Sequence, residues 1–222
     1  AAFALQDQGR KLSWYEAQKS RHDRTLDKVR AALPKDLPVT YLLRDNIRTF
    51  PFRDSDLVIA CGPDGLFVNI AKYLSGQLVL TVDSDPETND GKLMWHGEAT
   101  IKDVINKVLL GKPYETARIP LLSARTERMK AEVLAVSDVL VGRSDQVSAR
   151  YSLRVGAVTE NQSSSGILIS TGVGSTGWFS SIKTMVKAMS GSCGSFEREM
   201  SQEAKEFVYV VREPFSSRDT QV

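Results

Sequence analysis

The first 111 residues alternate between helical and strand-like patterns of apolar residues. A charged segment at about 8–33 has apolar residues at helical spacing and predicts a surface helix ended by Pro34. Residues 37–43 form a short, partly β-branched run that predicts a strand. The runs 56–61 (DLVIAC) and 77–82 (QLVLTV) are continuously apolar, which is typical of parallel strands covered on both faces.

Residues 66–74 (LFVNIAKYL), between those two runs, predict a helix, so the chain reads strand, turn, helix, strand with Gly62-Pro63-Asp64-Gly65 at the turn. The helical pattern is clearest at 100–110, where five apolar residues share one face. They are Ile101, Val104, Ile105, Val108 and Leu109. Gly111 and Pro113 then stop the helix.

After residue 112 the pattern becomes strand-like. Four runs have strand composition, namely 116–122, 131–141, 149–158 and 166–170. A short helix at 182–189 and a strand at 207–211 complete the chain. We therefore predict an open α/β domain with a mostly parallel sheet at 1–111, and a β-rich, sandwich-like domain at 112–222.

Composition narrows the function classes. The 222 residues are 41% hydrophobic and 25% charged with a net charge of +2, which fits a globular protein and argues against a nucleic-acid binder. No apolar run approaches the roughly 18 residues of a membrane span. Cys61 and Cys193 lack metal-site spacing, which argues against structural zinc and favours a reducing compartment, the cytoplasm.

Three stretches at strand ends are candidates for chemistry. The first is Gly62-Pro63-Asp64-Gly65, where a strand meets a helix and the helix N-terminus offers N–H groups to an anion. Asp64 is a poor neighbour for phosphate and suits a general base toward a hydroxyl, or a group near a metal ion. The alternative is a common Pro-Asp-Gly turn with Asp64 as a helix cap.

The second stretch is 167–178 (ILISTGVGSTGW). Its glycines match the dinucleotide-binding pattern G-x-G-x-x-G, but a helix directly after Gly177 is not expected and Glu197 is not at a strand end. We therefore reject a Rossmann site. A loop rich in glycine and hydroxyls can surround phosphates or a ribose through its N–H groups, or it can simply end a strand tightly.

The third stretch, 83–91 (DSDPETNDG), is acidic but lacks the ligand order of a calcium loop, so a solvated loop is the favoured interpretation. The chain contains no P-loop sequence, no nucleophile elbow and no metalloprotease motif.

In order along the chain, these stretches resemble the NAD kinase family. That family has Gly-Gly-Asp-Gly after a strand, then Asn-Glu, then Thr-Gly-Ser-Thr-Ala. The corresponding stretches here are 62–65, Ser137-Asp138 and 174–178. The loop DSDPETNDG and the segments IPLLSARTERMKAEV and VYVVREPFSSR are similar to the mitochondrial branch. The resemblance spans about residues 38–218.

The resemblance implies transfer of a phosphoryl group from ATP, with Mg²⁺, to the 2′-hydroxyl of the adenosine ribose of NAD. Asp64 would accept the hydroxyl proton, Gly62 and Gly65 would line the phosphates, and Asp138 beside Ser137 would hydrogen-bond the ribose. The dinucleotide pocket would be lined by Gly174, Ser175, Thr176, Gly177 and Trp178. The family also implies a homo-oligomer whose partners are small-molecule nucleotides.

The sequence departs from the family at several of these positions. Pro63 stands for a glycine and removes an N–H donor, Leu66 stands for threonine, and Ser137-Asp138 stands for Asn-Glu. Gly177-Trp178 stands for Ala-Tyr and keeps an aromatic wall. Two alternatives therefore remain: a kinase acting on another hydroxyl, such as that of a sugar or lipid, and a non-catalytic nucleotide-binding module.

Overall fold

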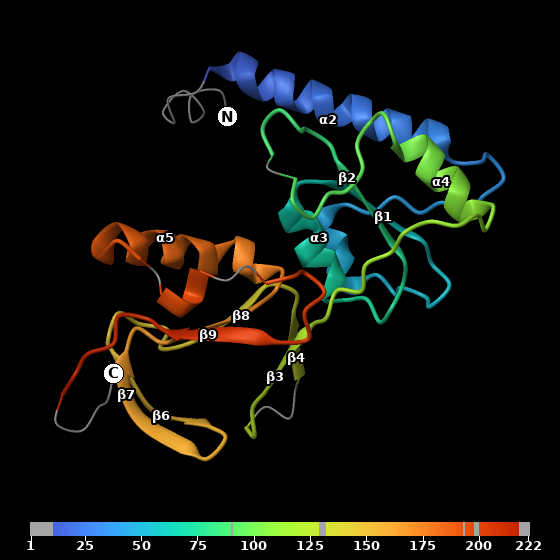
Figure 1. The fold of residues 1–222 in the computed structure, drawn as a ribbon. Helices are drawn as coiled ribbons and strands as arrows, with labels where there is room; N and C mark the ends of the chain where they lie inside the picture. The colour runs from blue at the N-terminus through green and yellow to red at the C-terminus, as the bar shows by residue number, and fades with distance from the viewer. Residues whose placement is uncertain (1–10, 90, 129–131, 193, 198–199, 218–222) are drawn as a thin grey trace. The chain divides into compact units, whose positions relative to one another are not determined.

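The computed structural model describes residues 11–89, 91–128, 132–192, 194–197 and 200–217, and Figure 1 shows its helices and strands. The chain divides into two compact units, Ala1–Thr116 and Ala117–Val222. The first unit combines helices with a parallel strand pair, and the second combines antiparallel strands with one longer helix. The predicted fold class, α/β followed by β-rich, is confirmed. Within the described residues, no helix is long and apolar enough to cross a membrane.

The first unit is built on a parallel strand pair. Its elements in chain order are α2 (Leu12–Ala32), η1 (Arg44–Thr49), β1 (Val58–Gly62), α3 (Asp64–Ala71), β2 (Val79–Asp83) and α4 (Ile101–Leu109). β1 and β2 run in the same direction, paired from Val58 and Val79 to Gly62 and Asp83. Their carboxyl ends therefore lie at one edge of the sheet, where open α/β folds bind ligands.

The core of the first unit lies on both faces of this strand pair. On one face, Leu80 and Val82 pack with apolar residues of α2 and α4, including the fully buried Ile101 and Ile105. On the other face, Ala60 packs with Ile47, Ile70 and Leu74. Alternate strand residues point to opposite faces, so a continuously apolar strand can supply both layers.

Two predictions for the first unit need correction. Residues 37–43 form no strand; Tyr41 and Leu43 are exposed there, and no sheet hydrogen bonds cover the segment within the described residues. α3 starts at Asp64 rather than at residue 66, directly after the extended Pro63. A proline before the first turn and an acidic residue inside it both favour a helix start. The helix therefore begins two residues before the first residue of the apolar pattern.

The second unit consists of antiparallel strands and α5. Its elements are β3 (Leu122–Arg125), β4 (Glu132–Ala135), β5 (Asp138–Val141), β6 (Ala149–Val155), β7 (Val158–Ser164), β8 (Ile167–Thr171), η2 (Gly174–Thr176), α5 (Trp178–Ser190), η3 (Gly194–Glu197) and β9 (Phe207–Val211). β8 lies between β5 and β9. β3 pairs with β4, and β6 pairs with β7 (Figure 1). The strand predicted at 207–211 is confirmed.

The strand boundaries of the second unit differ from the sequence pattern in three places. The run 116–122 contains no strand before Leu122, and the run 131–141 breaks into two strands. The run 149–158 folds back as a hairpin, with Val155 opposite Val158. Gly156, at φ +60° in the turn, permits that reversal. β7 was missed because its sequence, VTENQSS, is mostly polar.

Candidate functional site

Gly62, Pro63 and Asp64 join β1 to α3 at the carboxyl edge of the parallel pair. Gly62 is the last residue of β1, Pro63 precedes the helix and Asp64 is its first residue. Gly65 has open space around it, since a methyl group there would meet nothing within 4 Å. The strand-end turn predicted at 62–65 therefore lies where β1 passes into a helix N-terminus.

The Asp64 carboxylate contacts the chain beyond β2. Its Oδ2 accepts the backbone N–H of Lys92 at 3.1 Å, and its Oδ1 accepts that of Leu93 at 3.1 Å. No side chain caps α3, so the interpretation of Asp64 as a helix cap is wrong. A carboxylate has about four lone-pair sites, so each oxygen can accept a further hydrogen bond. Asp64 is thus fixed in orientation and can still accept a proton.

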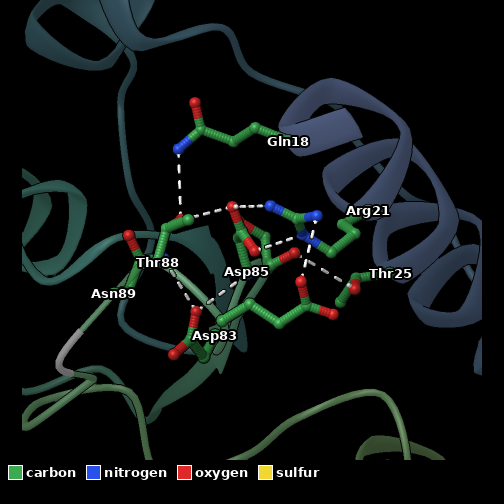
Figure 2. Close-up of polar contacts among 9 residues, drawn as sticks. Gln18, Arg21, Thr25, Asp83, Asp85, Thr88 and Asn89 are labelled. Carbon is green, nitrogen blue, oxygen red and sulfur yellow. Dashed lines mark hydrogen bonds and ion pairs between the residues drawn. The ribbon is translucent and has the colours of Figure 1, made fainter. Parts of the chain in front are cut away.

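The acidic stretch 83–91 is buried only at its start, so the expectation of a solvated loop is wrong for residues 83–85 and right for the exposed residues 86–88. Asp83, Ser84 and Asp85 expose 7%, 3% and 2% of their surfaces. We call residues 84–95 loop 84–95. Figure 2 shows two hydrogen bonds from the Arg21 guanidinium of α2 to the Asp85 carboxylate. Nε lies 2.5 Å from Oδ1, and Nη2 lies 3.2 Å from Oδ2. A buried carboxylate needs such a partner, and the arginine holds the pKa of Asp85 below its ordinary value.

In the second unit, Asp138 meets the hydroxyl of Ser170. Asp138 begins β5 opposite Ser170 on β8, and the Ser170 hydroxyl donates to its Oδ1 at 2.6 Å. Burial raises the pKa of Asp138, and hydrogen bonds from Ser170 and Ser137 partly oppose that rise. The Ser137 carbonyl accepts the N–H of Thr171 at 2.9 Å. The pair 137–138 is thereby fixed against the end of β8.

The turn after β8, residues 172–177, is named loop 172–177. Its hydroxyls bond inward: Ser175 donates to the carbonyl of Gly172 at 2.6 Å and Thr176 to that of Val173 at 3.1 Å. Ser175 is buried, so its hydroxyl shapes the loop rather than facing solvent. Thr176 and Gly177 are exposed. The loop therefore presents backbone and the Thr176 side chain to solvent.

Two glycines of loop 172–177 lie too close to their neighbours for any side chain. A methyl group at Gly174 would lie 2.4 Å from the Ser137 carbonyl oxygen and 2.5 Å from both Asp138 Oδ1 and Ser170 Oγ. One at Gly172 would lie 1.9 Å from the carbonyl oxygen of Ser201. The structure thus brings the motifs at 137–138 and 174–177 into direct contact, although Gly174 lies 36 positions after Asp138 in the chain.

α5 begins at Trp178, immediately after the loop, so the expectation of no helix there is wrong. Its N-terminal turn contains Phe179, which is buried and anchors the helix. Trp178 remains 41% exposed, with the Arg212 guanidinium carbon 5.3 Å from its ring centroid. The rejection of a Rossmann site is confirmed, since β8 is antiparallel to both of its neighbours and forms no βαβ unit.

Each unit therefore holds its own predicted residues. Gly62, Asp64 and Gly65 lie together in the first unit, and Ser137, Asp138 and 174–178 lie together in the second. Ser170 and the Lys92 and Leu93 amides were missed. Ser170 belongs to the hydroxyl-rich strand end visible in the sequence, whereas backbone amides leave no sequence signal. In the part of the chain that the structure describes, no three His, Cys, Asp or Glu side chains gather as a metal site.

Comparison with known proteins gives one consistent family. No family model matches the chain. It is 31% identical over 134 residues to an NAD kinase of Cupriavidus pinatubonensis, covering 57% of this chain and 42% of that protein. It is also 31% identical over 134 residues to an NAD kinase of Ralstonia nicotianae, covering 57% and 43%. The chain thus spans less than half the length of these relatives.

Solved structures match the fold as well. An Archaeoglobus fulgidus NAD kinase in complex with ATP matches with a TM-score of 0.51 at 19% identity, over 72% of this chain and 57% of that one. A yeast NADH kinase complexed with NADH matches with a TM-score of 0.55 at 15% identity, over 73% and 45%. The fold is that of the NAD kinases. In sequence the chain is similar to NAD kinases, as its motifs predict.

Proposed function

We propose that this chain forms the core of an NAD kinase that transfers a phosphoryl group from ATP to the 2′-hydroxyl of the adenosine ribose of NAD. The observation that supports this most is the contact of Asp138, Ser170 and Gly174, because it joins two separate family motifs into one structure. The second support is Asp64, which stands at the carboxyl edge of β1 and β2 with its orientation fixed.

In the first unit, Asp64 is the proposed general base. Its carboxylate takes the proton of the ribose 2′-hydroxyl as that oxygen bonds to the γ-phosphorus of ATP. The bond from that phosphorus to the β,γ-bridging oxygen breaks, and ADP leaves. Gly62 and Gly65 allow the phosphates to approach the backbone at the N-terminus of α3. Pro63 supplies no N–H there, so the phosphates have one donor fewer than in the family pattern.

In the second unit, Asp138 is the proposed ligand of a ribose hydroxyl, since a carboxylate accepts hydrogen bonds from adjacent hydroxyls. Ser170 and Ser137 orient it through their hydrogen bonds. Gly174 and Ser175 shape the loop, Thr176 and Gly177 provide its exposed surface, and Trp178 offers a half-exposed aromatic face to a base. These contacts bind and orient the nucleotide.

We propose that Mg²⁺ enters the site bound to the phosphates of the nucleotide. Mg²⁺ at such sites is bound through substrate phosphates and one or two carboxylates, so a dedicated protein cage is not required. The nucleotide phosphates would therefore supply the protein-independent ligands of the ion, and Asp64 keeps its role as the base. The bound ion would neutralise the charge of the transferring phosphoryl group.

We further propose a cytoplasmic homo-oligomer acting on small-molecule nucleotides. The family's oligomeric habit and the low cysteine content support this.

The decisive assay combines the purified protein with ATP, Mg²⁺ and NAD and measures NADP. We expect turnover, and Asp64→Ala should lower it roughly 1,000-fold, the middle of the range for loss of a general base. Asp103→Ala, at an exposed position on α4, is the matched control and should keep full activity. Absence of turnover with ATP, GTP and polyphosphate would refute the proposal.

The same purified protein can distinguish the two alternatives, a kinase acting on another hydroxyl and a non-catalytic nucleotide-binding module. The departures at Pro63, Leu66 and 137–138 fall in both the donor turn and the acceptor motif. A thermal-shift screen showing stabilisation by sugars but not by NAD would favour another hydroxyl acceptor. Nucleotide binding without turnover, unchanged in Asp64→Asn, would favour a binding module.

A further inference from the structure

The loop whose amides hold Asp64 is itself fixed from α2. Between β2 and His96, the described part of loop 84–95 leaves the sheet and returns to it, and His96 pairs with β2. Lys92 and Leu93, near the end of the loop, donate their N–H groups to Asp64. The direction of the Asp64 carboxylate therefore depends on where this loop lies.

Arg21 anchors the beginning of the loop. Besides its two bonds to Asp85, its Nη1 lies 3.1 Å from Oε2 of Glu87. The Asp85 side chain is 3% exposed and that of Arg21 18%, so the ion pair is shielded from water. Thr88 donates to the same Asp85 carboxylate and accepts from Gln18 of α2 at 3.3 Å. Figure 2 shows these side chains converging between α2 and the loop.

Asp83 links that anchored beginning to the amides at the end. Its Oδ1 accepts the N–H of Asp85 at 2.9 Å and the side-chain amide of Asn89 at 2.8 Å. Gly91 lies against its other oxygen at φ +59°, where a methyl group would be 2.7 Å from Oδ2. Gly91 directly precedes Lys92, so Asp83 contacts both the anchored beginning of the loop and the residue before the two amides that hold Asp64.

We propose that Arg21 is a positioning residue for Asp64, acting through Asp85, Asp83 and the backbone of loop 84–95. The catalytic part of this inference rests on the proposed function. Arg21 contacts neither nucleotide nor reacting atoms in this scheme. Its guanidinium forms two hydrogen bonds with the Asp85 carboxylate, whereas the single ammonium group of a lysine cannot reproduce this paired geometry. The loss of Arg21 should therefore change the orientation of the Asp64 carboxylate and leave the nucleotide-binding residues in place.

The first measurement is amide hydrogen exchange on peptides covering 91–95, comparing the full chain with Arg21→Ala, Arg21→Lys and Lys19→Ala. Lys19 forms an exposed ion pair within the same helix and is the matched control. We expect faster exchange at 92 and 93 in Arg21→Ala, an intermediate rate in Arg21→Lys and no change in Lys19→Ala. Protection of β1 and β2 should persist in all three, showing that the unit is folded.

The second measurement is steady-state kinetics with ATP, Mg²⁺ and NAD. Arg21→Ala should lower kcat roughly tenfold to a hundredfold with little change in the KM for NAD, as expected for a misplaced catalytic group. In an Asp64→Asn background the same substitution should give no further loss, because both act through one carboxylate.

The outcomes separate the two proposals. Unchanged exchange at 92 and 93 in Arg21→Ala and Arg21→Lys would overturn the positioning role, even with an active enzyme. An equal loss of kcat in the presence and absence of the Asp64 carboxylate would overturn it too. If the intact chain shows no kinase activity, the proposed function fails, while the exchange comparison still decides whether Arg21 fixes the Asp64 amides. If Arg21→Ala does not fold, Arg21→Lys decides by the same criteria.

Discussion

Loop 84–95 and loop 172–177 both follow strand ends, but different interactions hold them in place. Charged groups hold the first loop. Arg21 forms an ion pair with Asp85, and the Asp64 carboxylate accepts hydrogen bonds from two backbone N–H groups. In the second, neutral hydroxyls bond to carbonyls, and Gly172 and Gly174 lie in contact with backbone. The first loop should therefore respond to charge and pH, and the second to any added volume.

The largest expected effect on stability comes from adding one methyl group to loop 172–177. Gly174→Ala places a carbon 2.4 Å from the Ser137 carbonyl oxygen, and we expect a loss of about 3 kcal/mol in the free energy of unfolding. Gly65→Ala has open space and is the matched control, with a change within about 0.5 kcal/mol. Urea unfolding measures both. Equal losses would contradict the close packing around Gly174 as the cause of the effect.

Removal of the hydroxyl that bonds Asp138 should have the next largest effect. Ser170→Ala leaves a partly buried carboxylate without that donor, which should cost about 1.5–3 kcal/mol in unfolding free energy. The KM for NAD should rise several-fold with kcat nearly unchanged, because binding is weakened rather than chemistry. Ser152→Ala removes an exposed hydroxyl bonded to Asn161 and serves as the control. A fall in kcat at constant KM would contradict the binding role of Asp138.

A smaller effect is expected at Pro63. Pro63→Gly adds an N–H donor before the first turn of α3, and the KM for ATP should fall a few-fold in kinetic assays. The more flexible unfolded chain should lower stability by about 0.4–1 kcal/mol. Pro63→Ala restores the donor with less flexibility and should give the same KM at a smaller loss. An unchanged KM in both variants would show that this position does not contact the phosphates.

The smallest expected effect concerns stability at low pH. Acidification should remove the stabilising contribution of Asp85 and increase that of Asp138. The pKa of Asp85 is lowered by Arg21, so its contribution to stability is present above its ordinary value of 3.8 and disappears as pH falls through the lower folded value. The pKa of Asp138 is raised by burial, so its contribution is present below 3.8 and disappears as pH rises through the higher folded value.

Unfolding free energies between pH 2 and 6 test that difference against Asp85→Asn and Asp138→Asn. The first substitution should remove part of the acid destabilisation of the wild type. The second should remove a component of stability that grows toward low pH. The same pH slope in both variants would contradict the opposite pKa shifts.

The sequence predicted the parts of the fold whose patterns are local. The apolar runs at β1 and β2 and the five apolar residues of α4 fixed those elements to within about two residues. It failed where pairing decides structure: exposed residues 37–43 have strand composition but no partner among the described residues, and polar β7 is a strand because β6 pairs with it.

The sequence alone determined the family resemblance, the two kinds of fold and the candidates Asp64 and Asp138, because motifs and periodicity are properties of short segments. The tertiary structure decided what those residues touch. It placed Asp138 against Ser170 and Gly174, gave Asp64 the amides of Lys92 and Leu93, and buried Asp85 under Arg21, 64 residues earlier in the chain. These contacts join distant segments through backbone groups and buried charges, and their partners are set by packing that no local pattern records.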